Sequence, residues 1–369
     1  MTDTSKARLS GQKMSDRQTE LDGLVQGLHH LTLVTSNEEV NRRFYTEILG
    51  LRRVKLTVNQ DDIFHRHLFY ANERAETGSA ITFFEWPDLP KGTAGLTSPH
   101  HLSYAVTSLE ALAKWRIWLL SQGVSVVGPL PRDERVSLYL RDPDGVIVEI
   151  TKPNDEGITS DYLHELKDEG PAVTEISHDM RLISFDHASP VTLNPEVTVR
   201  FLGKLLGLRN YFKRKNPDQS DTAIIGIGNE ERSDFLRYLA SPTAPLGEVG
   251  TGSMHHIALA VEDETAQRMI LNRMNAMGVH NSGVIDRFWF KSLYFRDPDG
   301  NLLEIATKGP GYGADEPQDK LGSRLVLAPW LEERRNEIEG ALSELDARNA
   351  RSWPPAYSEA PSTPESLSS

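Results

Sequence analysis

The chain has 369 residues, with 40 Lys and Arg against 53 Asp and Glu, so its formal net charge is −13. This length suits about two domains, and the acidic balance argues against nucleic acid as a partner, because phosphate binding needs a basic surface. The absence of cysteine excludes disulfides, thiolate-ligated clusters and cysteine nucleophiles. No apolar run reaches the roughly 20 residues of a membrane helix and no apolar signal core stands at the N-terminus, which favours a cytoplasmic protein without a membrane partner.

The first half of the chain predicts two modules, each of one strand, one helix and three strands. Residues 1–24 are polar, and we expect them to be disordered. Module 1 covers residues 28–87 and begins with the strand LHHLTLVT, which contains His30. Module 2 covers residues 98–153, with a strand HHLSYAV, a helix at Leu109–Leu120, and two strands joined by Asp-Pro-Asp-Gly in LYLRDPDGVIVEI. Asp-Pro-Asp-Gly is typical of a tight turn between strands.

The second half repeats the first after a polar linker, residues 154–180, that we expect to be partly helical. FLGKLLGLR follows FYTEILGLR of module 1 by 157 residues, and HHIALAV and LYFRDPDGNLLEI follow their counterparts in module 2 by 155. These repeats define module 3, residues 181–242, and module 4, residues 253–308. Residues 313–345 form a C-terminal extension with a helix at 328–342, and the Pro- and Ser-rich residues 346–369 are expected to be disordered.

These repeats predict an α+β fold of four βαβββ modules. The curved sheet of one module has an apolar face that it cannot bury alone, so we expect modules to pair into two eight-stranded, cup-like open barrels with a ligand inside. In sequence, residues 25–153 make the first domain and residues 181–312 the second. Which modules pair in space is left open: 1 with 2 and 3 with 4, or 1 with 4 and 2 with 3.

Two strand glutamates, Glu149 and Glu304, each lie between apolar residues. A carboxylate on such a strand costs several kcal/mol unless it is paired or binds a cation, and a salt bridge or a solvent-facing edge would explain either one alone. However, His101 precedes Glu149 by 48 residues, and His256 precedes Glu304 by the same 48. With one histidine from module 1 or 3, each cup would hold a 2-His-1-carboxylate set, which suits Fe(II) or Mn(II) with open positions for substrate and O₂; zinc fits it less well.

The two ways of pairing modules predict different ligand sets. The first pairing gives His30, His101 and Glu149, and His187, His256 and Glu304; the second gives His30, His256 and Glu304, and His101, His187 and Glu149. An arginine and a tyrosine also recur 155 residues apart, as Arg132 and Tyr139 and as Arg287 and Tyr294.

Several segments resemble the vicinal oxygen chelate superfamily, which includes glyoxalase I and extradiol dioxygenases, and in particular its hydroquinone-type ring-cleaving dioxygenases. They are GLHHLTLVT, FYTEILGLRRVKLTVNQDD, ITFFEWP, VIDRFWFKSLYFRDPDGNLLEIATKGPGY and LVLAPWLEERRNEIE, spread over residues 27–340. This resemblance implies Fe(II) held by His30, His256 and Glu304. It also implies nearby polar residues, which carry over as His29, Thr32, His255, Arg287 and Tyr294.

Strict strand alternation would point His29 and His255 away from the metal, so a bulge or twist is needed to bring them near. The set His101, His187 and Glu149 is a candidate second metal site, although the resemblance implies a relic or structural role for that cup.

The predicted function is Fe(II)-dependent (or Mn(II)-dependent) cleavage of a hydroquinone or catechol ring with O₂. Arg287 would stabilise the anionic oxygen, Tyr294 or His255 would act as acid or base, and Phe288 and Trp289 would line the pocket. One alternative is a glyoxalase-type lyase or isomerase that uses Glu85 as a second carboxylate. Another is a non-catalytic small-molecule-binding protein. The expected partners are a small aromatic substrate and O₂, and a homo-oligomer is compatible with the sequence.

Overall fold

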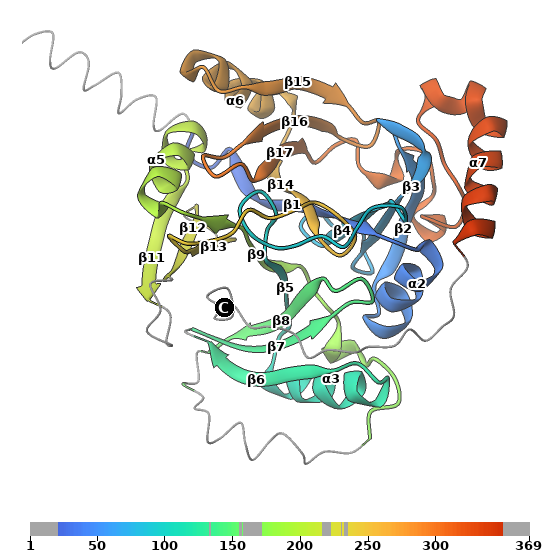
Figure 1. Cartoon of the computed structure of the whole chain (residues 1–369), viewed down its shortest axis with the longest axis horizontal. Coiled ribbons are helices and arrows are strands. Elements are labelled where there is room, and N and C mark those ends of the chain that lie inside the picture. Colours follow the sequence, from blue (N-terminus) through green and yellow to red (C-terminus); the bar gives the residue numbers. More distant parts are fainter. Residues whose placement is uncertain are drawn as a thin grey trace, which may run out of the picture.

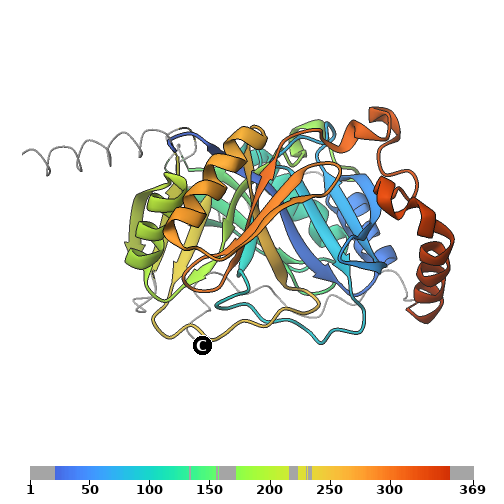
Figure 2. The ribbon, with the colours of Figure 1, turned by 90° about the horizontal axis from the view of Figure 1, so that it is seen from above.

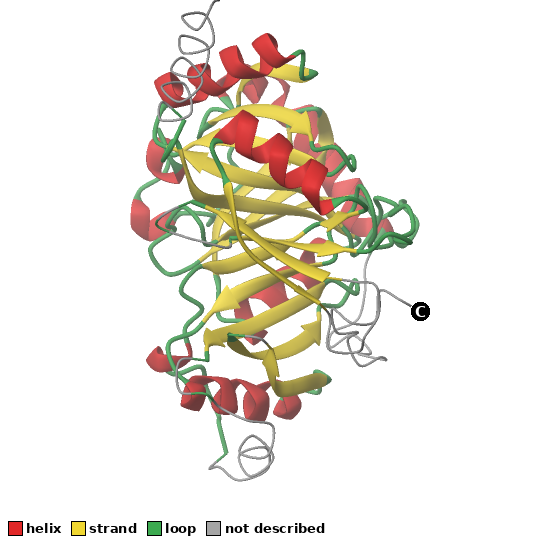
Figure 3. Cartoon of the chain, turned by 90° about the vertical axis from the view of Figure 1, so that its left-hand side faces the viewer, coloured by secondary structure: helices red, strands yellow, loops and turns green. Residues whose placement is uncertain are grey.

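The computed structural model describes residues 21–132, 134–154, 157, 172–215, 223–229, 231 and 235–349. Two large curved sheets form its centre, with helices on their outer sides (Figures 1 and 3). The predicted α+β class with paired, curled sheets is confirmed. Disorder was expected for residues 1–24 and 346–369, but residues 21–24 form a turn and residues 346–349 belong to the last helix and its C-cap. The rest of these two segments, and most of the linker expected to be partly helical, lie outside the described residues.

The first sheet combines module 1 with module 4. Its strand order is β15-β16-β17-β14-β1-β4-β3-β2, with β1 and β14 antiparallel at its centre. Its strands are β1 (Val25–Thr35), β2 (Arg52–Asn59), β3 (Asp62–Ala71), β4 (Ala80–Glu85), β14 (Met254–Val261), β15 (Asn281–Asp286), β16 (Lys291–Arg296) and β17 (Leu302–Thr307).

The second sheet combines module 2 with module 3, in the order β11-β12-β13-β9-β5-β8-β7-β6, and the short β10 adds a ninth strand beside β13. Modules therefore pair as 1 with 4 and 2 with 3, and each half of the sequence contributes one module to each sheet. The strands are β5 (His101–Ala105), β6 (Val126–Arg132), β7 (Arg135–Arg141), β8 (Ile147–Pro153), β9 (Phe185–Ser189), β10 (Val191–Thr192), β11 (Arg209–Lys215), β12 (Ala223–Gly228) and β13 (Leu236–Ala240).

Each module places its helical segment after its first strand, as the repeat predicts. Asparagine, serine or aspartate side chains cap the N-termini of these helices, and Gly278 ends α6 with a φ of 69°. The helical segments are α2 (Glu38–Arg43) continued by the π-helical η1 (Phe44–Ile48), α3 (Leu109–Ser121), α5 (Pro195–Leu206) and α6 (Glu264–Met277).

The C-terminal extension packs against module 1, at the right of Figure 2. It contains three 3₁₀ turns, η3 (Tyr312–Ala314), η4 (Gln318–Lys320) and η5 (Pro329–Arg334), and then α7 (Arg335–Arg348). The helix expected at 328–342 is present, but it runs on to Arg348. Another 3₁₀ turn, η2 (His178–Met180), precedes β9. Within the described ranges no helix is both long and apolar enough to span a membrane.

A continuous apolar core lies between the sheets and the helices. In β1, Leu31 and Leu33 belong to it, and Ile257 and Leu259 do the same in β14. Because side chains alternate along a strand, the residues between them face the hollow side of the first sheet. The core therefore fixes the direction in which the polar residues of β1 and β14 point.

Candidate metal centre and cavity

Three buried side chains meet at the centre of the first sheet. His30 pairs with Ala258, and Ala258 pairs in turn with Glu304, so His30 and Glu304 flank one position of β14. His256 lies two residues before Ala258 and so shares its face. Nε2 of His256 is 3.0 Å from Oε2 of Glu304, and Nε2 of His30 is 3.4 Å from the same oxygen. The pairing of modules 1 and 4 brings together the set that the resemblance implies.

The Glu304 carboxylate is fully buried, and neither of its oxygens has a hydrogen-bond partner among the described residues. Burial by itself would raise the pKa of Glu304, but His30 and His256 outweigh it and lower that pKa well below its usual range. A buried carboxylate anion without a positive partner is costly. A cation bound between this carboxylate and the two imidazole nitrogens that face it would remove that cost. These residues therefore fit a divalent ion of the 2-His-1-carboxylate type.

A hydrogen-bonded chain orients the imidazole of His30. The carbonyl of Thr307 can only accept, so it takes the Nε2–H of His29 at 3.1 Å. Nδ1 of His29 then accepts from Nδ1–H of His30 at 2.8 Å, which leaves the lone pair of His30 Nε2 directed at Glu304. Burial, and next the proximity of His30, lowers the pKa of His29 to about 3, which keeps this relay neutral.

His255 holds His256 in the same way, with 2.8 Å between their Nδ1 atoms. Burial and the neighbouring His256 lower the pKa of His255 to about 3. The register of β1 and β14 shifts by one residue at His29 and again at His255. These are the bulges that the two histidines need in order to bond to their neighbours instead of pointing to the opposite face.

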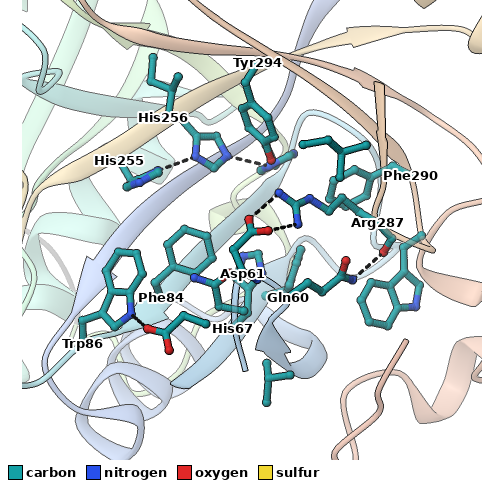
Figure 4. A pocket seen from close by; sticks show the side chains of 18 residues that line it. Gln60, Asp61, His67, Phe84, Trp86, His255, His256, Arg287, Phe290 and Tyr294 are labelled. Carbon is teal, nitrogen blue, oxygen red and sulfur yellow. Dashed lines mark hydrogen bonds and ion pairs between the residues drawn. The ribbon is translucent and has the colours of Figure 1, made fainter. Parts of the chain in front are cut away.

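A cavity of about 370 Å³ opens beside the cluster, with His30 and His256 in its wall. Figure 4 shows His256 there beside Tyr294 and His255. Aromatic rings make up much of the lining, and the ring centre of Phe290 lies 5.2 Å from that of His30. This volume and this mostly apolar wall suit a small organic ligand. The other aromatic lining residues are His67, Phe69, Phe84, Trp86, His255, Trp289 and Tyr294.

Arg287 and Tyr294 occupy the same wall. The guanidinium of Arg287 lies 5.7 Å from the ring centre of Tyr294, whose ring is 5.5 Å from that of His256. Two hydrogen bonds, of 2.7 and 3.1 Å, tie Arg287 to Asp61 in the turn between β2 and β3 (Figure 4). Burial and the Glu304 carboxylate raise the pKa of Tyr294 well above its usual value, so its hydroxyl keeps its proton and can donate.

Three residues from the sequence analysis lie elsewhere. Oγ1 of Thr32 bonds Oγ1 of Thr82 at 2.8 Å and is not part of the cavity wall. Phe288 packs against Trp330 of the C-terminal extension, whereas its neighbour Trp289 lines the cavity. Glu85 lies outside the cluster.

Glu85 is buried and serves the scaffold of module 1. One carboxylate oxygen accepts from the backbone N–H of Glu38 at 2.9 Å, and the other bonds Arg66 at 2.8 Å. Arg66 also reaches Asp346 of α7 at 2.7 Å. Glu85 thus links strand β4 to the first helix and to the C-terminal helix.

His67 is a cavity residue that the sequence analysis missed. It lies on β3 with Nε2 2.9 Å from Oγ1 of Thr82, and burial, followed by the nearby His30 and His256, lowers its pKa well below the usual range. His67 belongs to neither repeat pair. His67 shares one face of β3 with the apolar Phe69, and this position on a mostly apolar strand face is the signal that could have found it.

The second sheet holds a matching cluster. His187 and Glu149 both pair with Ser103 of β5, and His101 lies two residues before Ser103. Nε2 of His187 is 3.2 Å, and Nε2 of His101 is 3.4 Å, from Oε2 of Glu149. Tyr139, the counterpart of Tyr294, donates to Oε1 of Glu149 at 3.1 Å.

Comparisons with known proteins agree with the fold. A family model described as the Glyoxalase/Bleomycin resistance protein/Dioxygenase superfamily matches residues 27–150 and 184–305. A protein of Bacillus subtilis named "Putative ring-cleaving dioxygenase MhqA" is 34% identical over 324 residues, which cover 87% of this chain and 99% of that protein. The chlorohydroquinone/hydroquinone 1,2-dioxygenase of Sphingobium indicum is 28% identical over 327 residues, which cover 86% and 96% respectively.

Solved structures give the same architecture. The crystal structure of a protein described as a "putative dioxygenase" from Bacillus subtilis aligns with a TM-score of 0.73 at 30% identity, over 86% of this chain and 96% of that chain. Glyoxalase I from Zea mays aligns with a TM-score of 0.55 at 17% identity, over 76% and 92%, a likeness that concerns the fold alone.

Proposed function

Because the chain belongs to the glyoxalase, bleomycin resistance protein and dioxygenase superfamily, with relatives named ring-cleaving dioxygenases, we propose that it opens a hydroquinone- or catechol-type ring with O₂, using bound Fe(II). The family is the one that the sequence motifs predict. The observation that carries the proposal is the position of His30, His256 and Glu304 beside a cavity lined by aromatic rings.

The three residues would hold the ion and leave coordination positions open toward the cavity side chains. Bound Fe(II) would supply a redox-active centre at which a substrate hydroxylate and O₂ can react, and Mn(II) suits the same donor set. The net reaction needs no other reductant: both oxygen atoms of O₂ enter the product, one carbon–carbon bond of the ring breaks, and the ring supplies the electrons.

The chain's own residues orient the substrate and manage its protons. Arg287 keeps its positive charge and stabilises an anionic substrate oxygen. Tyr294 retains its proton and can donate a hydrogen bond to the oxygen on which charge develops. His255 is a neutral imidazole in the cavity wall. Its Nδ1 accepts from His256, so its proton lies on Nε2, from which it can donate a hydrogen bond to a substrate oxygen. Trp289 and Phe290 give the aromatic ring of the substrate flat surfaces to pack against.

Two other functions have less support. Glyoxalase-type chemistry usually needs a second carboxylate near the metal, and the candidate Glu85 is bonded to Glu38 and Arg66 instead. A non-catalytic binding protein would have no need of an unsatisfied Glu304 carboxylate facing two histidines. That non-catalytic function predicts an affinity for the ligand that does not depend on a metal.

The test is to load the metal-free protein with Fe(II) under anaerobic conditions and then measure O₂ uptake with a panel of hydroquinones and catechols. We expect one O₂ consumed per ring opened and a product two oxygen atoms heavier than the substrate. O₂ uptake that is absent with every diol, with either Fe(II) or Mn(II) loaded, would contradict the proposal. Isomerisation of a thiol adduct with Ni(II) or Zn(II) in the absence of O₂ would favour the glyoxalase-type alternative.

A further inference from the structure

We propose that His101, His187 and Glu149 bind a second divalent transition-metal ion, which joins module 2 to module 3. This inference does not rest on the reaction proposed for the first centre. All three side chains are buried, and their ligand atoms lie within 4.8 Å of one another. Oε2 of Glu149 has no hydrogen-bond partner among the described residues, although both imidazoles face it.

The strand register makes the second cluster a copy of the first. In each sheet a histidine and a glutamate flank one small residue on the central strand, Ala258 in one and Ser103 in the other. In each sheet the second histidine lies two residues before that small residue. The imidazole-to-carboxylate distances are 3.0 and 3.4 Å in the first cluster and 3.2 and 3.4 Å in the second. A donor set that suits a divalent ion in one sheet has the same spacing in the other.

Neighbouring residues orient both histidines as ligands. Nδ1 of His187 donates to Asp186 at 2.7 Å, and Arg135 bonds both oxygens of that carboxylate at 2.7 and 3.2 Å. This carboxylate–histidine arrangement fixes the ring and the tautomer in which Nε2 is left to bind a metal. Nδ1 of His101 is likewise 2.8 Å from Nδ1 of His100. The register of β9 shifts at Asp186, so a bulge turns this aspartate toward His187.

These contacts leave an electrostatic problem that a cation solves. With Nδ1–H of His187 given to Asp186, Nε2 carries a lone pair and faces an oxygen of Glu149 that can only accept. Two buried acceptors 3.2 Å apart repel unless a positive charge lies with them. A metal ion or an imidazolium proton can place that charge at the oxygen itself, and His101, with its Nε2 directed at the same oxygen, favours the metal.

Two further contacts suggest a structural ion. Tyr139 already occupies Oε1 of Glu149, which leaves Oε2 for the ion. Oγ of Ser189 lies 3.1 Å from Nε2 of His101 and adds an oxygen beside the same point. His101 and Glu149 belong to module 2 and His187 to module 3, so an ion bound to all three would cross-link the two halves of the chain and stabilise the folded state.

The two clusters serve as each other's control in a metal-counting experiment. Metal-free wild type, Glu149→Gln, Glu304→Gln and the double variant are incubated anaerobically with Fe(II), desalted, and assayed for iron per chain. We expect two iron ions per chain in the wild type, one in each single variant and none in the double variant. In the Glu304→Gln protein, which would be inactive, Fe(II) should still raise the melting temperature, and in the double variant it should not. One iron in the wild type that only Glu304→Gln removes would overturn the proposal and would mean that a proton occupies the second cluster.

A second variant covers the case in which Glu149→Gln folds poorly. Asp186→Asn keeps the shape of the side chain but removes the charge behind His187, so we expect Fe(II) affinity at this cluster to fall about 10- to 100-fold, with no change at the first cluster. The measurement is an Fe(II) titration of Asp186→Asn combined with Glu304→Gln, compared with Glu304→Gln alone. Equal affinity in the two proteins would count against the proposal. Failure of the diol assays with two irons bound would instead refute only the proposed reaction.

Discussion

Nε2 of His256 lies 3.0 Å from Oε2 of Glu304, on neighbouring parallel strands of the first sheet. His30 completes the cluster from the other end of the chain, across the antiparallel contact between β1 and β14. Each ligand is therefore held by a strand with a well-packed apolar face, so that removing one ligand should leave the sheet intact.

The first prediction concerns the metal ligands. Glu304→Gln and His256→Ala should each reduce ring cleavage by about 10³-fold or more, because three ligands act as one site and its loss removes at least about 4 kcal/mol of transition-state stabilisation. Initial rates of O₂ uptake measure the effect, and far-ultraviolet circular dichroism should match that of the wild type. Retained turnover in either folded variant would show that the site has been wrongly assigned.

The second prediction concerns the relay behind His30. His29→Phe keeps a flat ring but removes both nitrogens that connect His30 to the Thr307 carbonyl. We expect Fe(II) affinity to drop about 10- to 100-fold, as for other groups that orient a ligand. Titration with Fe(II) measures it, with His255→Phe as the matched variant on the other histidine. An unchanged affinity in both variants would contradict a role in positioning.

The third prediction separates catalysis by Arg287 from its ion pair. Arg287→Met should lower kcat/KM by about 10²- to 10³-fold, as the loss of one charge-stabilising donor does. Asp61→Asn removes the ion pair but keeps the guanidinium, and should retain most of the activity. Because the Asp61 side chain is 70% exposed, denaturant unfolding should show changes of about 1 kcal/mol or less in both variants. Equal loss of activity in both would mean that the pair, and not the charge, is what matters.

The fourth prediction concerns stability against pH. Burial, and then the proximity of Asp144, raises the pKa of Asp142 to about 7. The hydroxyl of Tyr45, in module 1, donates a hydrogen bond to the Asp142 carboxyl group. The folded state therefore holds this proton more tightly than the unfolded chain. Its stabilising effect is complete below about pH 4 and is lost as the pH rises toward 7.

Asp142→Asn should flatten the dependence of the unfolding free energy on pH. In the wild type this dependence should amount to a few kcal/mol, at about 1.4 kcal/mol per unit of pKa shift. The measurement is the free energy of unfolding between pH 4 and 8. Its repeat counterpart, Asp297, offers a matched variant, since its pKa is raised to about 6 by burial and Tyr238 bonds it at 2.8 Å. A slope that is the same in wild type and Asp142→Asn would contradict the assignment.

The fifth prediction concerns the C-terminal extension. Nζ of Lys55, a fully buried atom of β2, lies 2.5 Å from carboxylate oxygens of both Asp315 and Glu316. Lys55→Met should cost about 3–5 kcal/mol in free energy of unfolding, because it leaves Glu316 buried without its cation. Lys308→Met breaks an exposed pair and should cost about 1 kcal/mol or less. Similar losses in the two variants would refute the argument from burial.

The repeats allowed the sequence to predict much of this protein. Two short patterns, each present twice, define four modules, because strand alternation, helix ends and the Asp-Pro-Asp-Gly turns of modules 2 and 4 are local properties of neighbouring residues. The same repeats singled out His256 and Glu304, since both matched a second His and Glu at the same separation. The missed His67 lacks a counterpart, so no repeat marked it as special.

The pairing of modules was decided only in three dimensions. Each module offers a similar apolar face and a similar edge strand, so local pattern cannot distinguish partners, and the choice falls to contacts between residues more than 200 positions apart, such as His30 and Ala258. That choice determines which histidine joins which glutamate. It also places Asp61 of module 1 against Arg287 of module 4, because a cavity wall is built by whichever strands the packed sheets bring together.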